Sequence, residues 1–243
     1  MFVLVAGAIG LIAGSFLNAL LFRYNTGKSV LLGRSACMRC ATELSAIDLV
    51  PVLSFVFLRG KCRHCSTRIS WQYPAVELSA AALSVLVFLE HSAPLWFAYW
   101  FLVWMVLLFV VVYDLRHKII PWSASLVLLA LVIPYALLAG TWWGIVLGVP
   151  LLLVSFASGG RWMGWGDGML ELSLGGMLGL TAGFTALLIA FWSGAFVGIL
   201  LLLLSKNRYT MKSEVPFAPF LIAGAAVAYF FHVDLFSYLP ILF

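Results

Sequence analysis

Long apolar stretches separated by short polar segments dominate the pattern along the chain. A helix needs about 20 residues to cross the hydrocarbon core of a bilayer, and eight stretches reach or approach that length. They cover residues 2–22, 75–91, 94–113, 121–139, 141–158, 168–182, 184–205 and 216–239. The pattern therefore predicts an all-α polytopic membrane protein with about eight transmembrane helices.

One boundary between these stretches depends on glycines. Residues 168–205 form an apolar run that is too long for a single span. Glycine clusters interrupt regular structure, and this run contains them near its middle. They predict a turn near residues 180–183, with a short span before it and a span of normal length after it.

The polar segment that follows the first stretch predicts a separate small domain. We divide the chain into a first transmembrane helix (1–22), a four-cysteine domain (23–74) and a transmembrane core (75–243). No basic residue precedes the first apolar stretch, whereas a signal peptide carries its positive charge in front. Residues 1–22 are therefore interpreted as a retained helix.

Composition agrees with a membrane protein. Hydrophobic residues make up 64% of the 243 residues and charged residues only 9%, whereas an ordinary soluble domain carries about 25% charged residues. The surface of such a chain is suited to lipid, which excludes the class of ordinary soluble domains.

Basic residues lie only in alternate segments between the eight stretches. The segment 23–74 holds eight of the fourteen lysines and arginines, and the others fall in 114–120, 159–167 and 206–215. The positive-inside rule assigns these segments to the cytoplasm, so both termini are expected outside. Orientation in the membrane also explains the net charge of +5, and no nucleic-acid partner is expected.

Two CxxC pairs predict a metal site. Cys37 and Cys40 form the first pair, and Cys62 and Cys65 form the second after 21 intervening residues. This spacing resembles a zinc ribbon, in which four thiolates fill the coordination sphere and the metal is structural. Two disulfides or free thiols are the alternatives, and a cytoplasmic location disfavours disulfides. His64 is interpreted as a solvated loop residue.

Two aspartates are expected at the same depth of the membrane. Asp114 ends an inward-running stretch and Asp167 begins an outward-running one. Carboxylates near a bilayer are costly and mark functional sites. Two that lie close together share a proton, which leaves one general base and one general acid. Such a pair activates water for attack on a peptide carbonyl.

Each aspartate also has a structural explanation when taken alone. Asp114 is followed by Arg116 and Lys118, with which it can pair at the interface. Asp167 stands where a helix N-cap is expected. The nearby Glu171 either lines the same cavity or pairs with a basic loop. Their matched depth favours the functional interpretation of the two aspartates.

Ordered motifs give the chain a resemblance to a known family, the bifunctional type IV prepilin leader peptidases and N-methyltransferases, which are related to the GxGD aspartyl proteases. The resemblance covers nearly the whole chain. The motifs are GSFLN at 14–18, the CxxC pairs with LRGKC at 58–62, ISWQYPAVE at 69–77, DLRHKIIP at 114–121, GWGD at 164–167 and PFAPF at 216–220.

The resemblance implies cleavage of a basic leader from type IV prepilins or type II secretion pseudopilins, with Asp114 and Asp167 as the catalytic pair. It also implies methylation of the new amino terminus with S-adenosylmethionine, and a structural Zn site at the four cysteines. The expected location is the bacterial cytoplasmic membrane, in contact with lipid, with the catalytic face in the cytoplasm. For the methyl donor, the resemblance suggests only the cysteine domain with Lys61 and Glu77.

The chain departs from the family pattern in two places. Gly168 and Met169 follow the GxGD motif, where the family usually has a small apolar residue and a lysine, and Ala218 replaces a glycine of the PFGPF motif. Two alternatives remain open: a peptidase without methylation, and a cation-coupled carrier that uses the aspartates as a relay. The carrier offers no reason for the cysteine domain.

Overall fold

The computed structural model describes residues 1–27, 29, 35–204 and 215–236. The basic residues at positions 28, 34, 206, 208 and 212 lie outside the described part. The chain divides into two compact units, Met1–Phe109 and Val110–Phe243. In the described part the regular elements are helices, which confirms the all-α fold. The segment 23–74 also contains two isolated β-bridges.

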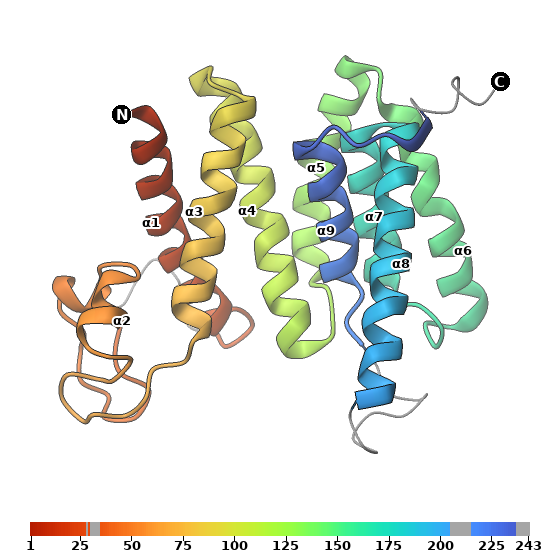
Figure 1. Cartoon of the computed structure of the whole chain (residues 1–243). Coiled ribbons are helices and arrows are strands. Elements are labelled where there is room, and N and C mark those ends of the chain that lie inside the picture. Colours follow the sequence, from red (N-terminus) through yellow and green to blue (C-terminus); the bar gives the residue numbers. More distant parts are fainter. Residues whose placement is uncertain (28, 30–34, 205–214, 237–243) are drawn as a thin grey trace. The chain divides into compact units, whose positions relative to one another are not determined.

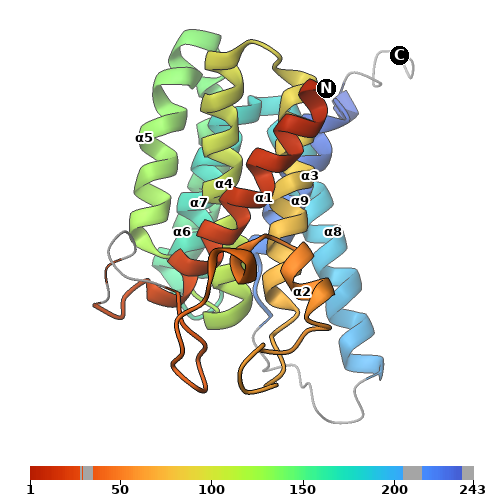
Figure 2. The same cartoon turned by 90° about the vertical axis from the view of Figure 1, so that its left-hand side faces the viewer.

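The first unit is built on two long helices that lie side by side (Figure 2). Helix α1 spans Phe2–Arg23 and packs against α3, which spans Gln72–Glu90. Small residues allow this close approach: a Cβ atom on Gly10 would lie 2.5 Å from the Ala80 carbonyl oxygen. The small residues of α1 therefore serve helix packing.

The polar segment between α1 and α3 carries two short helical elements. These are the 3-10 helix η1 (Ala46–Leu49) and the helix α2 (Leu53–Phe57). In Figure 2 this segment lies at the C-terminal end of α1 and the N-terminal end of α3. The four cysteines flank these two elements in the sequence.

Helix α4 (Pro94–His117) begins in the first unit and ends in the second. The remaining elements are α5 (Trp122–Ala139), η2 (Trp142–Leu147), α6 (Gly148–Ser158), α7 (Trp165–Leu178), α8 (Leu180–Leu204) and α9 (Ala218–Phe230).

Helix α7 lies at the centre of the second unit (Figure 1). It packs against α5, η2, α6, α8 and α9, and most of its residues from Gly168 onward are buried. Glycines make the approach to η2 possible, because a Cβ atom on Gly175 would overlap the Gly144 carbonyl oxygen. The residues of α7 are therefore positioned by contacts on several sides.

The turn between α7 and α8 lies slightly earlier than the sequence predicted. Helix α7 ends at Leu178 and α8 begins at Leu180, so Gly179 alone forms the break. Gly179 has φ of 84°, a conformation that glycine adopts without steric cost. The predicted division into a short and a normal segment is confirmed, but the expected position at 180–183 was wrong.

Five helices are long and apolar enough to cross a membrane: α1, α3, α4, α5 and α8. Two further apolar segments are shorter, namely η2 with α6 and α9, and α7 is a helix of 14 residues that contains Asp167 and Glu171. These three segments correspond to the expected spans 141–158, 168–182 and 216–239. The protein is a multi-pass membrane protein, and helix length by itself supports five of the eight expected spans.

Candidate active site and metal centre

Asp114 lies in the last turn of α4, after the apolar part of the helix. Its side chain is only 4% exposed. The carboxylate accepts a hydrogen bond from the backbone N–H of Ala218, the first residue of α9. A helix N-terminus has unpaired N–H groups and favours negative charge, so α9 holds this carboxylate in place.

The other oxygen of Asp114 is available for chemistry. Oδ2 is buried and has no hydrogen-bond partner among the described residues. The interfacial pairing considered from the sequence is not seen there, because neither Arg116 nor Lys118 forms an ion pair with Asp114. A buried carboxylate oxygen without a partner is rare in a stable fold, which distinguishes this aspartate from an ordinary interfacial residue.

Asp167 is the third residue of α7, whose N-cap is Gly164. Its carboxylate accepts a hydrogen bond from the backbone N–H of Gly164. The side chain thus bonds back to the start of its own helix, as the third residue of a capping box does. The expected N-cap position for Asp167 was wrong by three residues, because the glycine begins the helix.

The second glycine of the GWGD motif brings two motifs into contact. A Cβ atom on Gly166 would lie 2.6 Å from Cβ of Ile120, a distance that real Cβ contacts do not show. Ile120 follows Asp114 in the DLRHKIIP motif. The absence of a side chain at position 166 therefore sets how closely the start of α7 approaches the end of α4.

We expect Gly166→Ala to lower the rate of the reaction at this site by about a hundredfold, because a displacement near 1 Å has effects of that size. Ile120→Gly should restore part of the rate in the double variant, since it removes the Cβ, Cγ1 and Cδ1 atoms that the added methyl group would meet. Gly198→Ala is the control, because a Cβ atom there meets nothing within 4 Å. Activity assays on wild type, the two single variants, the double variant and the control measure the coupling, and an unchanged rate for Gly166→Ala would contradict the packing argument.

The structure brings the two predicted aspartates together. The carboxyl groups of Asp114 and Asp167 are close enough to interact electrostatically. Three sequence motifs build this arrangement: one supplies Asp114, one supplies Asp167, and PFAPF supplies the N-terminus of α9. Asp114 is buried and Asp167 is half-buried. Two acids that interact in this way are suited to sharing a proton, and hence to general acid and base catalysis.

The departure after the GWGD motif has a packing explanation at its first position. A Cβ atom on Gly168 would lie 2.7 Å from a methyl carbon of Leu152 on α6. Glycine at position 168 therefore allows α6 to approach α7. Met169 is half-buried, and nothing in the structure explains why it replaces a lysine.

Glu171 lies one turn after Asp167 on α7 and is 2% exposed. Its Oε1 atom has no hydrogen-bond partner among the described residues. The elements that pack against α7 contribute only two titratable side chains, Tyr135 and Tyr229. Among the described residues no cation forms an ion pair with Glu171, so the alternative of a basic-loop partner is not seen there. A buried charge without a partner is costly inside a membrane protein, so we expect the carboxyl group of Glu171 to be uncharged.

Replacement of Glu171 by Gln should accordingly leave thermal stability and reaction rate close to wild type, because glutamine resembles the uncharged acid in size and polarity. Glu171→Lys should destabilise the protein by about 3 kcal/mol, the cost of a lysine within a membrane helix. Thermal unfolding in detergent measures both effects. A Gln variant as unstable as the Lys variant would show that the carboxyl group is charged.

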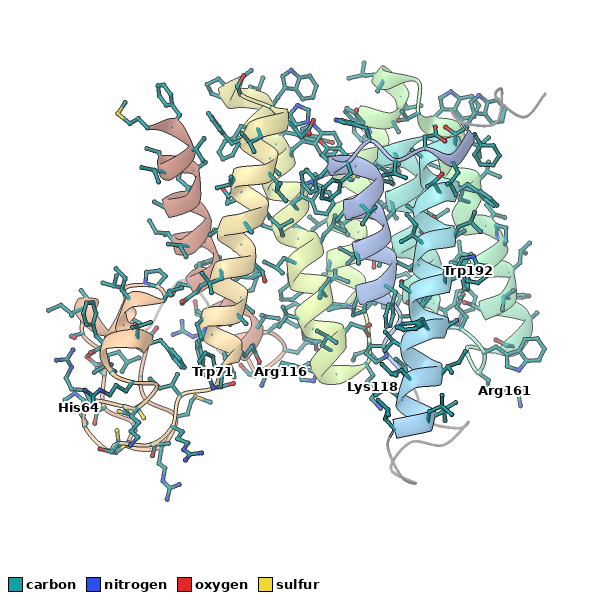
Figure 3. All side chains as sticks on the ribbon, viewed as in Figure 1. His64, Trp71, Arg116, Lys118, Arg161 and Trp192 are labelled. Carbon is teal, nitrogen blue, oxygen red and sulfur yellow. The ribbon has the colours of Figure 1, made fainter. Side chains whose placement is uncertain are left out.

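The lysines and arginines of the second unit that the structure describes gather at one end of it. Arg116, Lys118 and Arg161 lie at the lower end of this unit in Figure 3. Arg116 and Lys118 flank the end of α4, and Arg161 follows α6. Asp114 belongs to the same last turn of α4 as Arg116, so this carboxylate lies near the basic end of the unit.

The four cysteines form a single cluster in the first unit. Their sulfur atoms all lie within 4.8 Å of one another. The two CxxC segments have the same backbone hydrogen bonds: Cys37 N–H donates to Thr42 O, and Cys62 N–H donates to Thr67 O. A sulfur set of this size and number fits one tetrahedral zinc ion, and the cluster agrees with the predicted metal site.

The surroundings of Cys65 favour its thiolate form. A hydrogen bond from the Thr67 side chain, together with its backbone N–H, lowers the pKa of the Cys65 thiol to about 6. Arg63 lies between the second pair of cysteines, and its Nε donates to Asp48 Oδ1 at 2.8 Å. Hydrogen bonds from Ser45 and Arg63 hold the pKa of Asp48 below its usual range. The Arg63–Asp48 contact is therefore present at neutral pH, and it weakens as the pH falls through the lowered pKa of Asp48.

Lys61 and Glu77, suggested for the methyl donor, have different surroundings. Lys61 is exposed at the edge of the second CxxC segment. Glu77 is 6% exposed, and its Oε2 accepts a hydrogen bond of 2.7 Å from the Val52 N–H. The Ser15 hydroxyl also donates to this carboxylate. No hydrogen bond or ion pair joins Glu77 to Lys61 among the described contacts.

Two contacts at the site were missed by the sequence analysis. One is the backbone N–H of Ala218, and the other is the Ile120 side chain against Gly166. The prolines of the PFAPF motif were a usable signal for the first, because proline is favoured in the first turn of a helix. The second depends on packing between helices and leaves no local signal.

Comparison with known proteins supports the family resemblance. The family model described as the Bacterial Peptidase A24 N-terminal domain matches residues 8–91. A protein of Burkholderia pseudomallei (strain 1026b), named prepilin leader peptidase/N-methyltransferase, is 32% identical over 92% of this chain and 83% of its own length. Proteins with the same name from Aeromonas hydrophila (35% identical, covering 81% and 71%) and Bacillus subtilis (29%, covering 94% of each) are also similar. No solved structure matches the chain.

Proposed function

The chain belongs to the prepilin leader peptidase/N-methyltransferase family, and from this premise we propose that Asp114 and Asp167 cleave the basic leader from type IV prepilins or type II secretion pseudopilins. In the same proposal the protein then methylates the new amino terminus. The observation that carries the first activity is that the charge of Asp114 acts on the Asp167 carboxyl group, near one end of the second unit.

The proposed cleavage uses the two carboxyl groups in different protonation states. Like charges at short distance disfavour double ionisation, so one group keeps a proton while the other is a carboxylate. The carboxylate removes a proton from water as the water oxygen attacks the scissile carbonyl carbon. The protonated group donates to the developing oxyanion or to the leaving amine. The two groups act as a pair, so neither is assigned a fixed role.

The hydrogen bonds of the site support this use of one protonated and one ionised carboxyl group. Ala218 N–H and Gly164 N–H each bind one carboxylate, while Asp114 Oδ2 has no partner among the described atoms. Both aspartates are thus held in position by backbone groups that do not titrate. An oxygen atom remains free to contact water or substrate, which preorganised catalysis requires.

Placement at the cytoplasmic membrane face suits the proposed substrate. The basic segments are expected in the cytoplasm, and Asp114 lies beside them. A prepilin whose basic leader remains inside and whose apolar segment enters the bilayer would present its cleavage site at this depth. We propose the bacterial cytoplasmic membrane as the location, with both termini outside.

The second activity requires S-adenosylmethionine, which supplies a reactive methyl group when it is bound. The names of the relatives support this activity for the family. We assign the zinc ion a structural role, because four sulfur ligands leave no open coordination position for hydrolytic chemistry. The metal would hold the segment between α1 and α3 in one conformation.

The proposal is tested with purified protein in lipid vesicles and a full-length prepilin. Cleavage on gels reports the peptidase, and the mass of the processed amino terminus reports addition of one methyl group. Cleavage without the methyl group would support the alternative of a peptidase alone. Ion transport by vesicles that leave prepilin intact would favour a carrier instead.

A further inference from the structure

Two motifs of the first unit have no part in the carboxylate pair. They are GSFLN on α1 and the ISWQYPAVE segment that leads into α3. The first of them borders a cavity of about 320 Å³ between α1 and the cysteine segment. Residues that matter for the argument are Ser15, Phe16, Ala19, Arg23, Ser35 and Pro51, all of which line it.

A single buried carboxylate, supplied by the second motif, holds the two sides of this cavity. Glu77 of α3 accepts a hydrogen bond from the Ser15 hydroxyl on one side. On the other side it accepts the Val52 N–H, next to Pro51, at 2.7 Å. Val52 has φ of 60°, which is strained for a β-branched residue. The contact with Glu77 therefore maintains a backbone conformation that places Pro51 at the cavity.

The lining combines three kinds of chemistry. Arg23 provides a guanidinium group, which matches the geometry of a carboxylate. Ser15 and Ser35 provide hydroxyl groups, and Phe16 and Pro51 provide apolar surface that suits a flat aromatic ring. Small-molecule sites are typically about 300–1,000 Å³ in volume and mostly apolar, with a few polar groups. The cavity lies at the small end of that range.

S-adenosylmethionine carries a carboxylate, ribose hydroxyls and a flat adenine ring, so its parts match this lining. We propose that the cavity between α1 and the cysteine segment is the binding site for the methyl donor. The inference rests on the proposed methyltransferase activity and adds the location of its donor. Glu77 acts in it as a positioning residue, which differs from the direct contact suggested by the family resemblance.

The location also fits the acceptor. Ser15, Ala19 and Arg23 belong to the second half of α1, whose last residue is Arg23. If the basic segments are cytoplasmic, this half of α1 approaches the cytoplasmic interface. An amino terminus created by cleavage at that interface would lie at the depth of the cavity.

Ultraviolet crosslinking of radiolabelled S-adenosylmethionine to the full-length protein in detergent tests the site without requiring turnover. In wild type we expect the label on peptides covering residues 12–23 or 35–51. Ala19→Trp, which fills the cavity, should reduce labelling at least tenfold. Ala8→Trp is the matched control, because Ala8 is exposed on the same helix and does not line the cavity. Arg23→Gln should weaken labelling about tenfold or more, as expected for loss of a charged hydrogen-bond donor.

The outcomes separate the location from the function. Specific label on other peptides, or full labelling of Ala19→Trp, would overturn the location while leaving methyl transfer intact. No specific labelling of wild type would contradict the methyltransferase activity itself. A higher KM for prepilin in Ala19→Trp with unchanged labelling would show that the cavity holds the substrate and not the donor. Peptide mapping on wild type keeps the test decisive even if a variant does not fold.

Discussion

Asp114→Asn and Asp167→Asn should each abolish prepilin cleavage, with a fall in rate of about a thousandfold or more, as expected for loss of a general acid or base. Asparagine retains a carbonyl oxygen that accepts the backbone hydrogen bond from Ala218 or Gly164. The fold should therefore survive, while the ability to take up or release a proton at that position is lost. Time courses of leader removal on gels, with protein matched for membrane content, measure the effect.

Asp234→Asn provides a control for these variants. Asp234 is also an aspartate of the second unit, but it accepts a hydrogen bond from the Thr181 hydroxyl at 2.6 Å. We expect cleavage by this variant at close to the wild-type rate. Substantial cleavage by either dyad variant would falsify the assignment of the catalytic pair, whereas equal loss in all three would indicate a general loss of folding.

Cys37→Ser and Cys62→Ser should each release the metal and destabilise the segment between α1 and α3. Structural zinc contributes about 10–16 kcal/mol of apparent binding free energy in small domains, so loss of one ligand has a large effect. We expect methylation to fall more than cleavage, because Ser35 and Pro51 of this segment line the proposed donor cavity. Metal analysis, limited proteolysis and the mass of processed pilin measure the three consequences.

His64→Ala is the matched control for the metal site. His64 is exposed in the second CxxC segment, and its replacement should leave one zinc ion bound. Wild-type protein that contains no zinc and has four reactive thiols would contradict the metal assignment. If the cysteine variants lost both activities equally, the proposal that the first unit serves methylation and the second unit serves cleavage would be wrong.

Several features were predictable from the sequence because their cause is local. Apolar length predicted the five long helices, and the CxxC spacing predicted a cluster of four sulfurs. Glycines predicted a break between α7 and α8, although its position moved to Gly179, the residue with positive φ. The exact ends of helices were less predictable, because they depend on which residue adopts the backbone conformation of the cap.

The candidate site was predictable only in part. Charge distribution and hydrophobic pattern placed Asp114 and Asp167 at matched depth, which made their meeting plausible without specifying it. Their backbone partners were not predictable, since the Ala218 N–H comes from a helix far along the chain. The same holds for Glu77, whose contacts with Ser15 and Val52 join three separate segments.

The sequence by itself determined that this chain is a multi-pass helical membrane protein with a four-cysteine segment and acids at the helix ends. Hydrophobic length, charge placement and cysteine spacing are properties of neighbouring residues, so they can be read without a structure. Only the tertiary structure decided that α9 binds the Asp114 carboxylate and that Ile120 fills the space beside Gly166. Those contacts arise from how helices pack, and an apolar helix surface allows many packings until small residues and hydrogen bonds select one.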